Sequence, residues 1–378
     1  MHILEIKDLE ELARKKVPKM FFDYNNSGSW TERTYKDNIH DFQKIKFRQR
    51  VAVDMSNRNL KTKMIGQDVE MPVAIAPTGL TGMQHADGEI LAAQAAEEFG
   101  IPFTLSTLSV CSIEEVAKKT SRPFWFQLYV MRDKKFMARL IDRAKAANCS
   151  ALVLTLDLQI LGQRHIDVRN GLSTPPKFNL KHIYQVLSKP MWCLKMLKTK
   201  NHFFGNVVGH VDGVSDVRSL TSWIGEQFDP SLDWKEVDWI RKRWGGKLII
   251  KGILDSEDAL LAARTGADAI IISNHGGRQL DGASSTISIL PEIVAEAGDQ
   301  IEIHMDGGIR SGQDVAKAMC LGAKGTYIGR SFIYGLGAMG KAGVSKTLEI
   351  IKKELDMTMA LCGRRDIHEL NEENIYKK

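Results

Sequence analysis

Short apolar runs alternate with stretches of helical periodicity along most of this chain, and the pattern begins at Met71. Each apolar run is rich in Val, Ile and Leu and ends in polar or glycine residues, which is typical of a parallel strand buried on both faces. The expected strands lie at 72–78, 103–108, 124–130, 151–157, 247–252, 269–273, 301–308 and 325–330. The expected helices lie at 86–100, after the Ser112 capping box, and at 134–147, 256–265, 287–297 and 312–322.

About eight strand–helix units predict parallel strands joined by right-handed helical crossovers. We therefore expect an α/β fold, a closed (β/α)8 TIM barrel at 71–335. The alternative is an open doubly wound sheet, but no early strand leads into the Gly-x-Gly-x-x-Gly turn of a dinucleotide-binding fold. We expect one domain over 1–378, with an N-terminal helical cap at 1–70 and C-terminal helices at 336–378.

The N-terminal cap is predicted from the helical spacing of Leu9, Ala13 and Val17, which Pro18 interrupts. A short aromatic segment containing Tyr24 then leads into a glycine turn. Judged by its neighbours alone, Tyr24 is more simply a packing residue than a functional one.

A long segment between the fourth and fifth expected strands exceeds an ordinary crossover, so we expect an insertion after strand 4. Its middle, 175–215, mixes apolar residues such as Trp192 with lysines that include Lys195, Lys198 and Lys200. This composition suits a surface that lies on an anionic membrane without crossing it. A soluble lid over the active site and an oligomer contact are equally compatible with it.

Composition narrows the function classes. The net charge of +6 suits an anionic small substrate, a phosphate group or an acidic membrane surface. We expect no nucleic-acid partner and no metal site, because the chain has no dense arginine run, zinc-ligand spacing or binding module. We also expect no signal peptide and no membrane span. Free, mostly buried thiols in a reducing compartment best explain the unpaired cysteines, Cys111, Cys149, Cys193, Cys320 and Cys362.

Polar side chains end every expected strand, and in a (β/α)8 enzyme the ligand site is built at these carboxyl ends. Buried polar groups need hydrogen-bond partners, so a purely structural barrel gives little reason for such a set. The last two strand ends combine glycine amides with Arg310 and Arg330, which predicts a phosphate site. The strand-end residues are Thr78, Ser106, Gln127 with Tyr129, Thr155 with Asp157, Lys251, Ser273 with His275, Asp306 with Gly307 and Gly308, and Gly329 with Arg330.

Residues 269–281 carry the strongest signal, an apolar run that stops in Ser-Asn-His-Gly-Gly-Arg. Gly276 and Gly277 would let the backbone turn sharply and approach a ligand closely. His275 and Arg278 would then project above the strand. The alternative is an ordinary glycine turn whose His and Arg are merely solvated.

Together these motifs resemble the FMN-dependent L-2-hydroxy-acid dehydrogenase and oxidase family over about residues 5–365. Segments 161–167, 170–173 and 223–231 look most like the bacterial membrane-associated L-lactate dehydrogenases, with mandelate dehydrogenase next and glycolate oxidase further away. The residues that carry the resemblance are Tyr24, Ala76-Pro-Thr78, Gln127-Leu-Tyr129, Thr155-Leu-Asp157, Arg164, Lys251, Ser273 to Gln279, Asp306 to Arg310, and Gly329-Arg330.

The resemblance implies a role for each candidate. His275 would be the catalytic base, and Asp157 would stabilise the imidazolium that forms. Arg278 and Arg164 would hold the substrate carboxylate in bidentate fashion. Tyr24 and Tyr129 would add hydroxyl groups at the substrate.

The cofactor it implies is FMN. Lys251 would lie near flavin N1, where negative charge develops on reduction. The isoalloxazine would be bound by Thr78, Ser106, Gln127 and Thr155, with Ser273 as a flavin or His-positioning contact, Asp306 on the ribityl chain, and Gly308, Arg310, Gly329 and Arg330 on the phosphate.

The function it implies is oxidation of an L-2-hydroxy acid, L-lactate to pyruvate above others, with electrons passed to a membrane quinone. The alternatives are an L-mandelate dehydrogenase and a soluble oxidase that makes hydrogen peroxide. Gly79 gives mild support to a dehydrogenase, and Leu108 is compatible with a substrate side chain larger than hydrogen. A homotetramer on the cytoplasmic face of the inner (cell) membrane is also implied. A non-enzymatic phosphate-binding barrel would leave His275, Asp157 and Lys251 unexplained.

Overall fold

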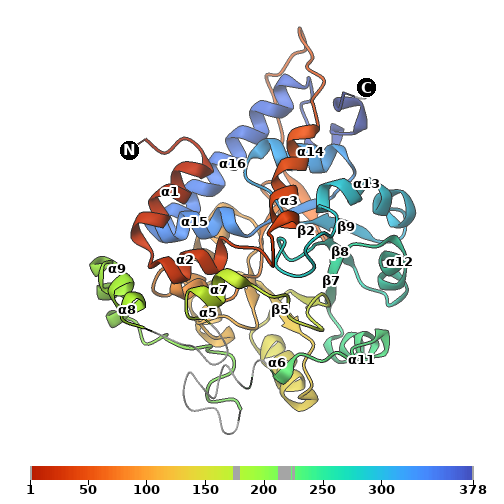
Figure 1. The fold of residues 1–378 in the computed structure, drawn as a ribbon. Helices are drawn as coiled ribbons and strands as arrows, with labels where there is room; N and C mark the ends of the chain where they lie inside the picture. Colours follow the sequence, from red (N-terminus) through yellow and green to blue (C-terminus); the bar gives the residue numbers. More distant parts are fainter. Residues whose placement is uncertain (1, 173–178, 212–222, 224–225, 377–378) are drawn as a thin grey trace.

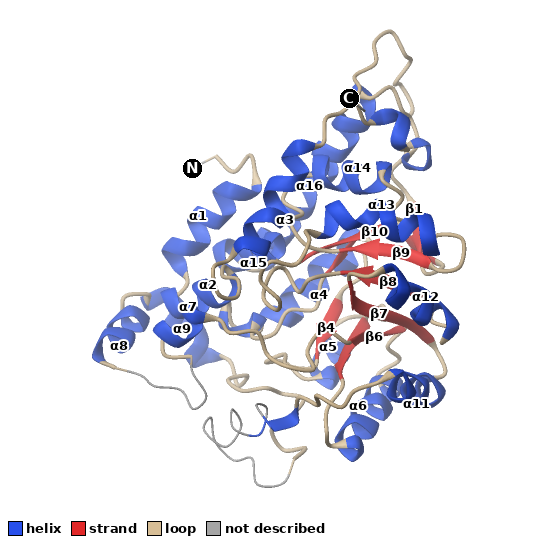
Figure 2. Cartoon of the chain, turned by 45° about the vertical axis from the view of Figure 1, so that its right-hand side comes forward, coloured by secondary structure: helices blue, strands red, loops and turns tan. Residues whose placement is uncertain are grey.

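Eight parallel strands form a nearly closed barrel in the computed structural model, which describes residues 2–172, 179–211, 223 and 226–376 (Figures 1 and 2). The sheet order is β3-β10-β9-β8-β7-β6-β5-β4, and a bridge between Ile75 and Phe103 joins its two ends. The (β/α)8 prediction is confirmed. The strands are β3 (Val73–Ile75), β4 (Thr104–Ser106), β5 (Trp125–Tyr129), β6 (Ala151–Thr155), β7 (Lys247–Ile253), β8 (Ala269–Ile272), β9 (Glu302–Met305) and β10 (Gly325–Ile328).

Helices surround this barrel and follow the strands in the chain (Figure 2). Several begin at polar caps, of which the sequence predicted the one at Ser112. The Ser112 capping box is present, and Asp133, Asp255 and Ser311 side chains accept hydrogen bonds from the first turns of their helices. The helices are α4 (Gly88–Phe99), α5 (Ile113–Lys119), α6 (Lys134–Ala146), α11 (Trp234–Trp244), α12 (Ser256–Arg264), α13 (Thr286–Ala297), α14 (Gly312–Cys320), α15 (Arg330–Met339) and α16 (Lys341–Leu361).

Residues 1–70 contain the expected N-terminal helices and, in addition, a short hairpin. The helices there are α1 (Ile6–Lys16), α2 (Lys19–Asn25) and α3 (Arg33–Lys44). An antiparallel hairpin follows, β1 (Thr62–Met64) paired with β2 (Gln67–Val69). Its two-residue turn places Ile65 and Gly66 at φ 49° and 83°, the left-handed geometry that suits hairpin twist. Buried Met64 and Val69 pack against the barrel interior, so the hairpin closes the amino-terminal end of the barrel.

The N-terminal helices bring the aromatic segment that contains Tyr24 to the opposite end of the barrel, where the strands end. Leu9, Ala13 and Val17 are buried, and α1 packs along α15 (Figure 1). Pro18 then ends that helix and caps α2, which carries Tyr24.

The insertion after strand 4 is confirmed, since the chain between β6 and β7 contains helices of its own. They are α7 (His165–Arg169), α8 (Leu180–Leu187) and α9 (Pro190–Lys198), followed by α11. Of the segment expected at 175–215, residues 175–178 and 212–215 lie outside the described residues. Helices α8 and α9 lie beside α2, where the rings of Phe21 and Trp192 stack at 5.5 Å (Figure 1). Among the described residues, no helix is long and apolar enough to cross a membrane.

Candidate active site

A cavity of about 460 Å³ opens at the carboxyl ends of the strands. Its volume lies within the range of small-molecule and cofactor sites. Twelve of the predicted site residues line it: Tyr24, Thr78, Tyr129, Arg164, Lys251, His275, Arg278, Asp306, Gly308, Arg310, Gly329 and Arg330. Ser106, Gln127, Thr155, Asp157 and Ser273 are not among the lining residues; hydrogen bonds connect them to one another or to residues that line it.

The loop after β8 has a left-handed backbone. His275, Gly276 and Gly277 have φ of 56°, 65° and 75°. A Cβ atom on Gly277 would lie 2.5 Å from the backbone nitrogen of Tyr35, so only glycine fits there. Reciprocal side-chain hydrogen bonds of 2.8 Å between Asn274 and Asn38 lock the loop onto α3. The loop is therefore rigidly built, which excludes the solvated glycine turn.

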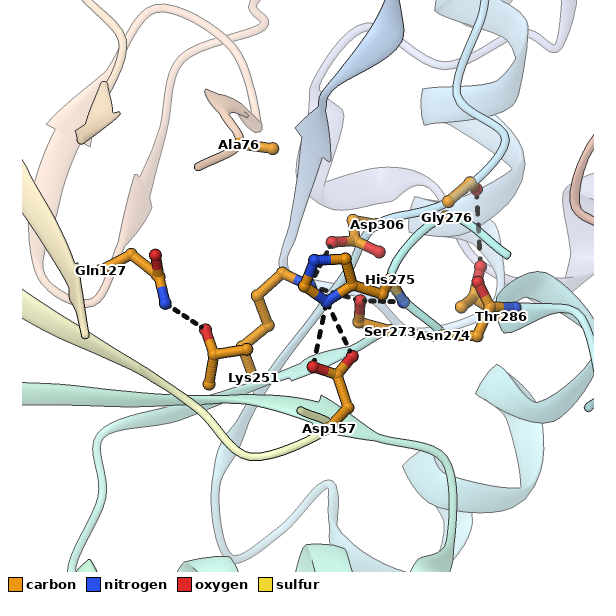
Figure 3. Close-up of polar contacts among 12 residues, drawn as sticks. Ala76, Gln127, Asp157, Lys251, Ser273, Asn274, His275, Gly276, Thr286 and Asp306 are labelled. Carbon is orange, nitrogen blue, oxygen red and sulfur yellow. Dashed lines mark hydrogen bonds and ion pairs between the residues drawn. The ribbon is translucent and has the colours of Figure 1, made fainter. Parts of the chain in front are cut away.

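His275 and Asp157 face each other at the mouth of β6 and β8 (Figure 3). Nδ1 of His275 lies 3.0 and 3.2 Å from the two carboxylate oxygens of Asp157. Burial would raise the pKa of Asp157, but the charges of His275 and Lys251 outweigh burial and hold this pKa below its ordinary value. The ionised carboxylate only accepts hydrogen bonds, so Nδ1 carries the hydrogen and Nε2 keeps its lone pair.

The ionisation of His275 agrees with that assignment. Burial lowers its pKa, and the partly opposing effect of Asp157 does not restore it to the ordinary value. The ring is therefore neutral at neutral pH. His275 can therefore accept a proton at Nε2, and the carboxylate of Asp157 beside it would stabilise the imidazolium that forms.

Two arginines lie near the Tyr24 ring. The guanidinium carbons of Arg278 and Arg164 lie 4.6 and 5.8 Å from its centroid. Burial, and then the charge of Arg164, lower the pKa of Arg278 to about 10, so Arg278 stays charged at neutral pH. The Tyr129 ring lies 6.4 Å from that of His275 at an interplanar angle of 24°. Two cations and two phenols thus gather beside His275, an arrangement that suits a small carboxylate.

Lys251 links the loop after β8 to the end of β9. Its Nζ lies 2.6 Å from Ser273 Oγ and 3.0 Å from Asp306 Oδ2 (Figure 3). Burial would lower the pKa of Lys251, but Asp306 and Asp157 outweigh burial and raise it. The side chain is therefore a buried positive charge at the wall of the cavity.

A second network lies behind the lining at the ends of β4, β5 and β6. The amide of Gln127 donates to Thr155 Oγ1 at 3.0 Å, and its oxygen accepts from Ser106 Oγ at 3.1 Å. The Thr78 hydroxyl makes a long contact, 3.5 Å, to the Ala76 carbonyl. These polar groups need another partner to use their remaining capacity.

The predicted phosphate end contains unsatisfied groups. Arg310 Nη2 and Asp306 Oδ1 are buried and have no hydrogen-bond partner among the described residues. Gly329 precedes the first turn of α15, and a helix amino terminus favours an anion. A cofactor with a phosphate and hydroxyl groups would satisfy these atoms. The residues present therefore fit FMN.

Arg330 has a structural part that the sequence does not indicate. Its guanidinium donates to the backbone carbonyls of Asn25, Gly276 and Ser27 at 2.7–2.9 Å and covers the Tyr35 ring at 4.3 Å. It thereby ties α2 and the loop after β8 to α15 at the cavity edge.

Several site residues escaped the sequence analysis. Gln279 donates to the carbonyls of Asp157 and Ile160 at 2.6 and 2.8 Å, and so joins the loops of His275 and Asp157. Its place in the motif is the only sequence signal. The insertion also supplies cavity walls, namely His202, Phe203, Phe204 and Phe228. Since their partners are distant in sequence, no local pattern marks them.

Comparisons with known proteins agree with this geometry. L-lactate dehydrogenase of Vibrio cholerae is 45% identical over 98% of this chain and 98% of its own, and that of Acinetobacter baylyi is 44% identical over 98% and 97%. The crystal structure of the monotopic membrane protein (S)-mandelate dehydrogenase superposes with a TM-score of 0.95 at 34% identity, and each chain is fully covered. The sequence model of the FMN-dependent dehydrogenases matches residues 13–377. The chain therefore belongs to the FMN-dependent dehydrogenase family, and its cofactor is FMN.

Proposed function

We propose that this chain oxidises an L-2-hydroxy acid, L-lactate to pyruvate, and passes the electrons to a membrane quinone. The observation that carries the proposal is the His275–Asp157 pair at 3.0 Å, which faces two arginines across one cavity. Full-length similarity to proteins named L-lactate dehydrogenase supports the choice of substrate.

In this proposal the substrate carboxylate binds between Arg278 and Arg164. Both guanidiniums line the cavity, and a planar fork can donate two parallel hydrogen bonds to a carboxylate. The hydroxyl groups of Tyr24 and Tyr129 complete the polar end of the site. The substrate is thereby fixed with its hydroxyl-bearing carbon toward His275.

Nε2 of His275 then accepts a proton from the bound acid. Its neutral state and the carboxylate at Nδ1 prepare it for this step, because Asp157 stabilises the imidazolium that forms. Bound FMN supplies the two-electron acceptor. Lys251 places a buried positive charge beside the cofactor site.

The remaining polar groups hold the cofactor. Asp306 would bind the ribityl chain, and the unsatisfied Arg310 nitrogen would bind the phosphate. The other proposed contacts are Thr78, Ser106, Gln127, Thr155 and Ser273 to the isoalloxazine, and Gly308, Gly329 and Arg330 to the phosphate.

L-Mandelate is the second candidate substrate. The (S)-mandelate dehydrogenase structure quoted above superposes with a TM-score of 0.95, and the cavity walls contributed by Leu108, Phe203 and Phe228 are apolar. A soluble oxidase that yields hydrogen peroxide is the alternative for the acceptor.

Anaerobic mixing of the purified flavoprotein with a panel of 2-hydroxy acids tests the substrate. We expect L-lactate to bleach the flavin faster than mandelate or glycolate. A preparation without flavin, or one that L-lactate does not bleach, would contradict the proposal. Peroxide yield compared with reduction of a quinone analogue then separates an oxidase from a dehydrogenase.

Helices α8 and α9 support peripheral membrane contact through 175–215. Several of their apolar side chains are exposed, and Leu187 and Leu197 are 66% and 80% exposed. Lys198 lies in the last turn of α9. Apolar residues flanked by lysines favour the surface of an anionic bilayer, and we place the protein at the cytoplasmic face of the cell membrane.

Co-sedimentation with anionic lipid vesicles tests this contact. Leu187→Glu combined with Leu197→Glu should abolish binding, whereas Leu361→Glu, at an exposed leucine on α16, should not. Equal binding by all the variants would refute the assignment.

We further propose that residues 1–378 form one FMN-binding domain and assemble as a homotetramer. One cooperative unfolding transition and a light-scattering mass of four chains are expected; a monomer would refute the assembly.

A further inference from the structure

A row of polar side chains runs through the otherwise apolar barrel interior. Ile303 and Met305 of β9 pack outward against the helices, so the alternate residues Glu302, His304 and Asp306 face inward. Tyr327 joins them from the neighbouring strand β10 (Figure 2).

Hydrogen bonds connect this row. Glu302 Oε1 lies 2.7 Å from His304 Nε2, and His304 Nδ1 lies 3.1 Å from the Tyr327 hydroxyl. The backbone nitrogen of Ile65, in the hairpin turn, donates to the same Glu302 oxygen at 2.8 Å. His304 is 0% exposed and Tyr327 is 1% exposed, so each needs these partners.

The surroundings of the row are apolar. The barrel interior around it consists of residues such as Val153, Ile249 and Ile271. Apolar side chains at positions 304 and 327 would stabilise the fold at least as well, since a buried row of polar groups adds no stability over a well-packed apolar core. The presence of this polar row therefore points to a function at one of its ends.

The upper end of the row reaches the cofactor cavity. Tyr327 lines the cavity together with Lys251 and Asp306. Asp306 Oδ1 there has no hydrogen-bond partner among the described residues. The row therefore ends beside the group to which we assign the ribityl chain.

The ionisation of Glu302, at the end of the row away from the cavity, decides which atom donates each hydrogen bond. Burial opposes ionisation of Glu302, but hydrogen bonding to His304 holds its pKa below the ordinary value, so it is a carboxylate and accepts only. Nε2 of His304 therefore carries the hydrogen that Glu302 accepts, and in the tautomer with this single ring hydrogen Nδ1 is an acceptor. The Tyr327 hydroxyl donates to Nδ1, and its oxygen retains a lone pair for another donor.

We propose that Tyr327 is a further FMN-binding residue, whose phenol oxygen accepts a hydrogen bond from a ribityl hydroxyl group, and that His304 and Glu302 are positioning residues that fix this oxygen. The inference rests on the proposed function, because that function assigns the ribityl chain to the Asp306 end of the cavity.

Release of FMN from the full-length holoprotein tests the contact. Recovery of free-flavin fluorescence on dilution gives the dissociation constant. We expect Tyr327→Phe to raise this constant about tenfold, the effect of one net hydrogen bond. The control is Trp125→Phe, which alters a neighbouring ring whose centroid lies 6.0 Å from that of Tyr327. It should leave the dissociation constant within about twofold of the wild-type value.

The positioning role has a separate readout. His304→Leu should raise the constant about threefold, and the double variant with Tyr327→Phe should be no weaker than Tyr327→Phe alone. Additive effects would show that His304 acts through packing. Melting temperature is followed in parallel, since a purely structural role would lower it without this coupling.

Deoxy-FMN analogues identify the bond itself. Holoprotein is reconstituted with FMN that lacks the 2′, 3′ or 4′ hydroxyl group. For one analogue, wild type and Tyr327→Phe should bind equally, because the partner hydroxyl is absent. Unequal binding with all three analogues, or an unchanged FMN constant in Tyr327→Phe, overturns the inference. Wild type that binds no FMN or is not bleached by L-lactate would instead overturn the proposed function.

Discussion

Replacement of Asp157 by asparagine tests the proton-accepting pair most directly. The carboxylate lies 3.0 Å from His275 Nδ1, and at an effective dielectric constant of 20 two unit charges at this distance attract by about 5.5 kcal/mol. A neutral amide retains a hydrogen bond of about 1–2 kcal/mol. The imidazolium thus loses about 3.5–4.5 kcal/mol, and kcat should fall by about 10³-fold.

The pH profile gives the sign of the effect. His275 acts only when neutral, so kcat/KM rises with pH through its pKa. Asp157 raises this pKa against the lowering by burial, so Asp157→Asn should move the acid limb to lower pH. Stopped-flow bleaching by L-lactate across pH 4–8 measures both quantities.

A matched variant guards against a general loss of fold. Asp268→Asn removes an equally isosteric carboxylate, paired with Lys247 at 2.7 Å at the opposite end of the barrel, and should leave kcat within about twofold. If Asp157→Asn lowers kcat less than about threefold, with FMN bound and the acid limb unmoved, the role of Asp157 is wrong.

Three other variants examine separate parts of the structure. Arg278→Lys should lower kcat/KM about hundredfold, mainly through KM and with FMN retained, because a lysine cannot replace the bidentate fork; an unchanged KM would remove Arg278 from the carboxylate site. Gly277→Ala should destabilise the protein by more than about 2 kcal/mol in urea unfolding, since φ is +75° and Tyr35 lies 2.5 Å from the new Cβ; a loss under about 0.5 kcal/mol would contradict this. Hydrogen bonding to Arg143 lowers the pKa of Glu114 to about 2. That partly exposed pair should contribute under about 1 kcal/mol above pH 5, a contribution that fades as pH falls toward 2, so Glu114→Gln should cost stability at pH 7 but not at pH 2.

The barrel could be predicted because its signals are local. Strand and helix periods, helix caps such as Ser112, and polar residues at strand ends depend on a few neighbouring positions. The hairpin at 62–69 was missed because its strands are three residues each, and such short alternation resembles a loop.

The candidate site could be recognised only from the sequence and the tertiary structure together. A neutral base and its carboxylate were recognisable residue by residue, but His275 and Asp157 are 118 positions apart. Parallel pairing of both β6 and β8 with β7 brings their strand ends together. Pairing of β9 with β10 joins His304 to Tyr327, and tertiary packing directs Arg330 onto backbone carbonyls; no local pattern encodes these contacts.

Sequence alone therefore determined the order of the elements, the strand ends that bear chemistry, and the glycine turn after β8. These follow from side-chain periodicity and backbone sterics within each segment. Tertiary structure decided which charges meet, which groups are buried, and which polar atoms of Asp306 and Arg310 have no hydrogen-bond partner among the described residues. Those properties depend on how closely the fold brings together segments that are far apart in the sequence, because hydrogen bonds and charge interactions are strong only at short distances.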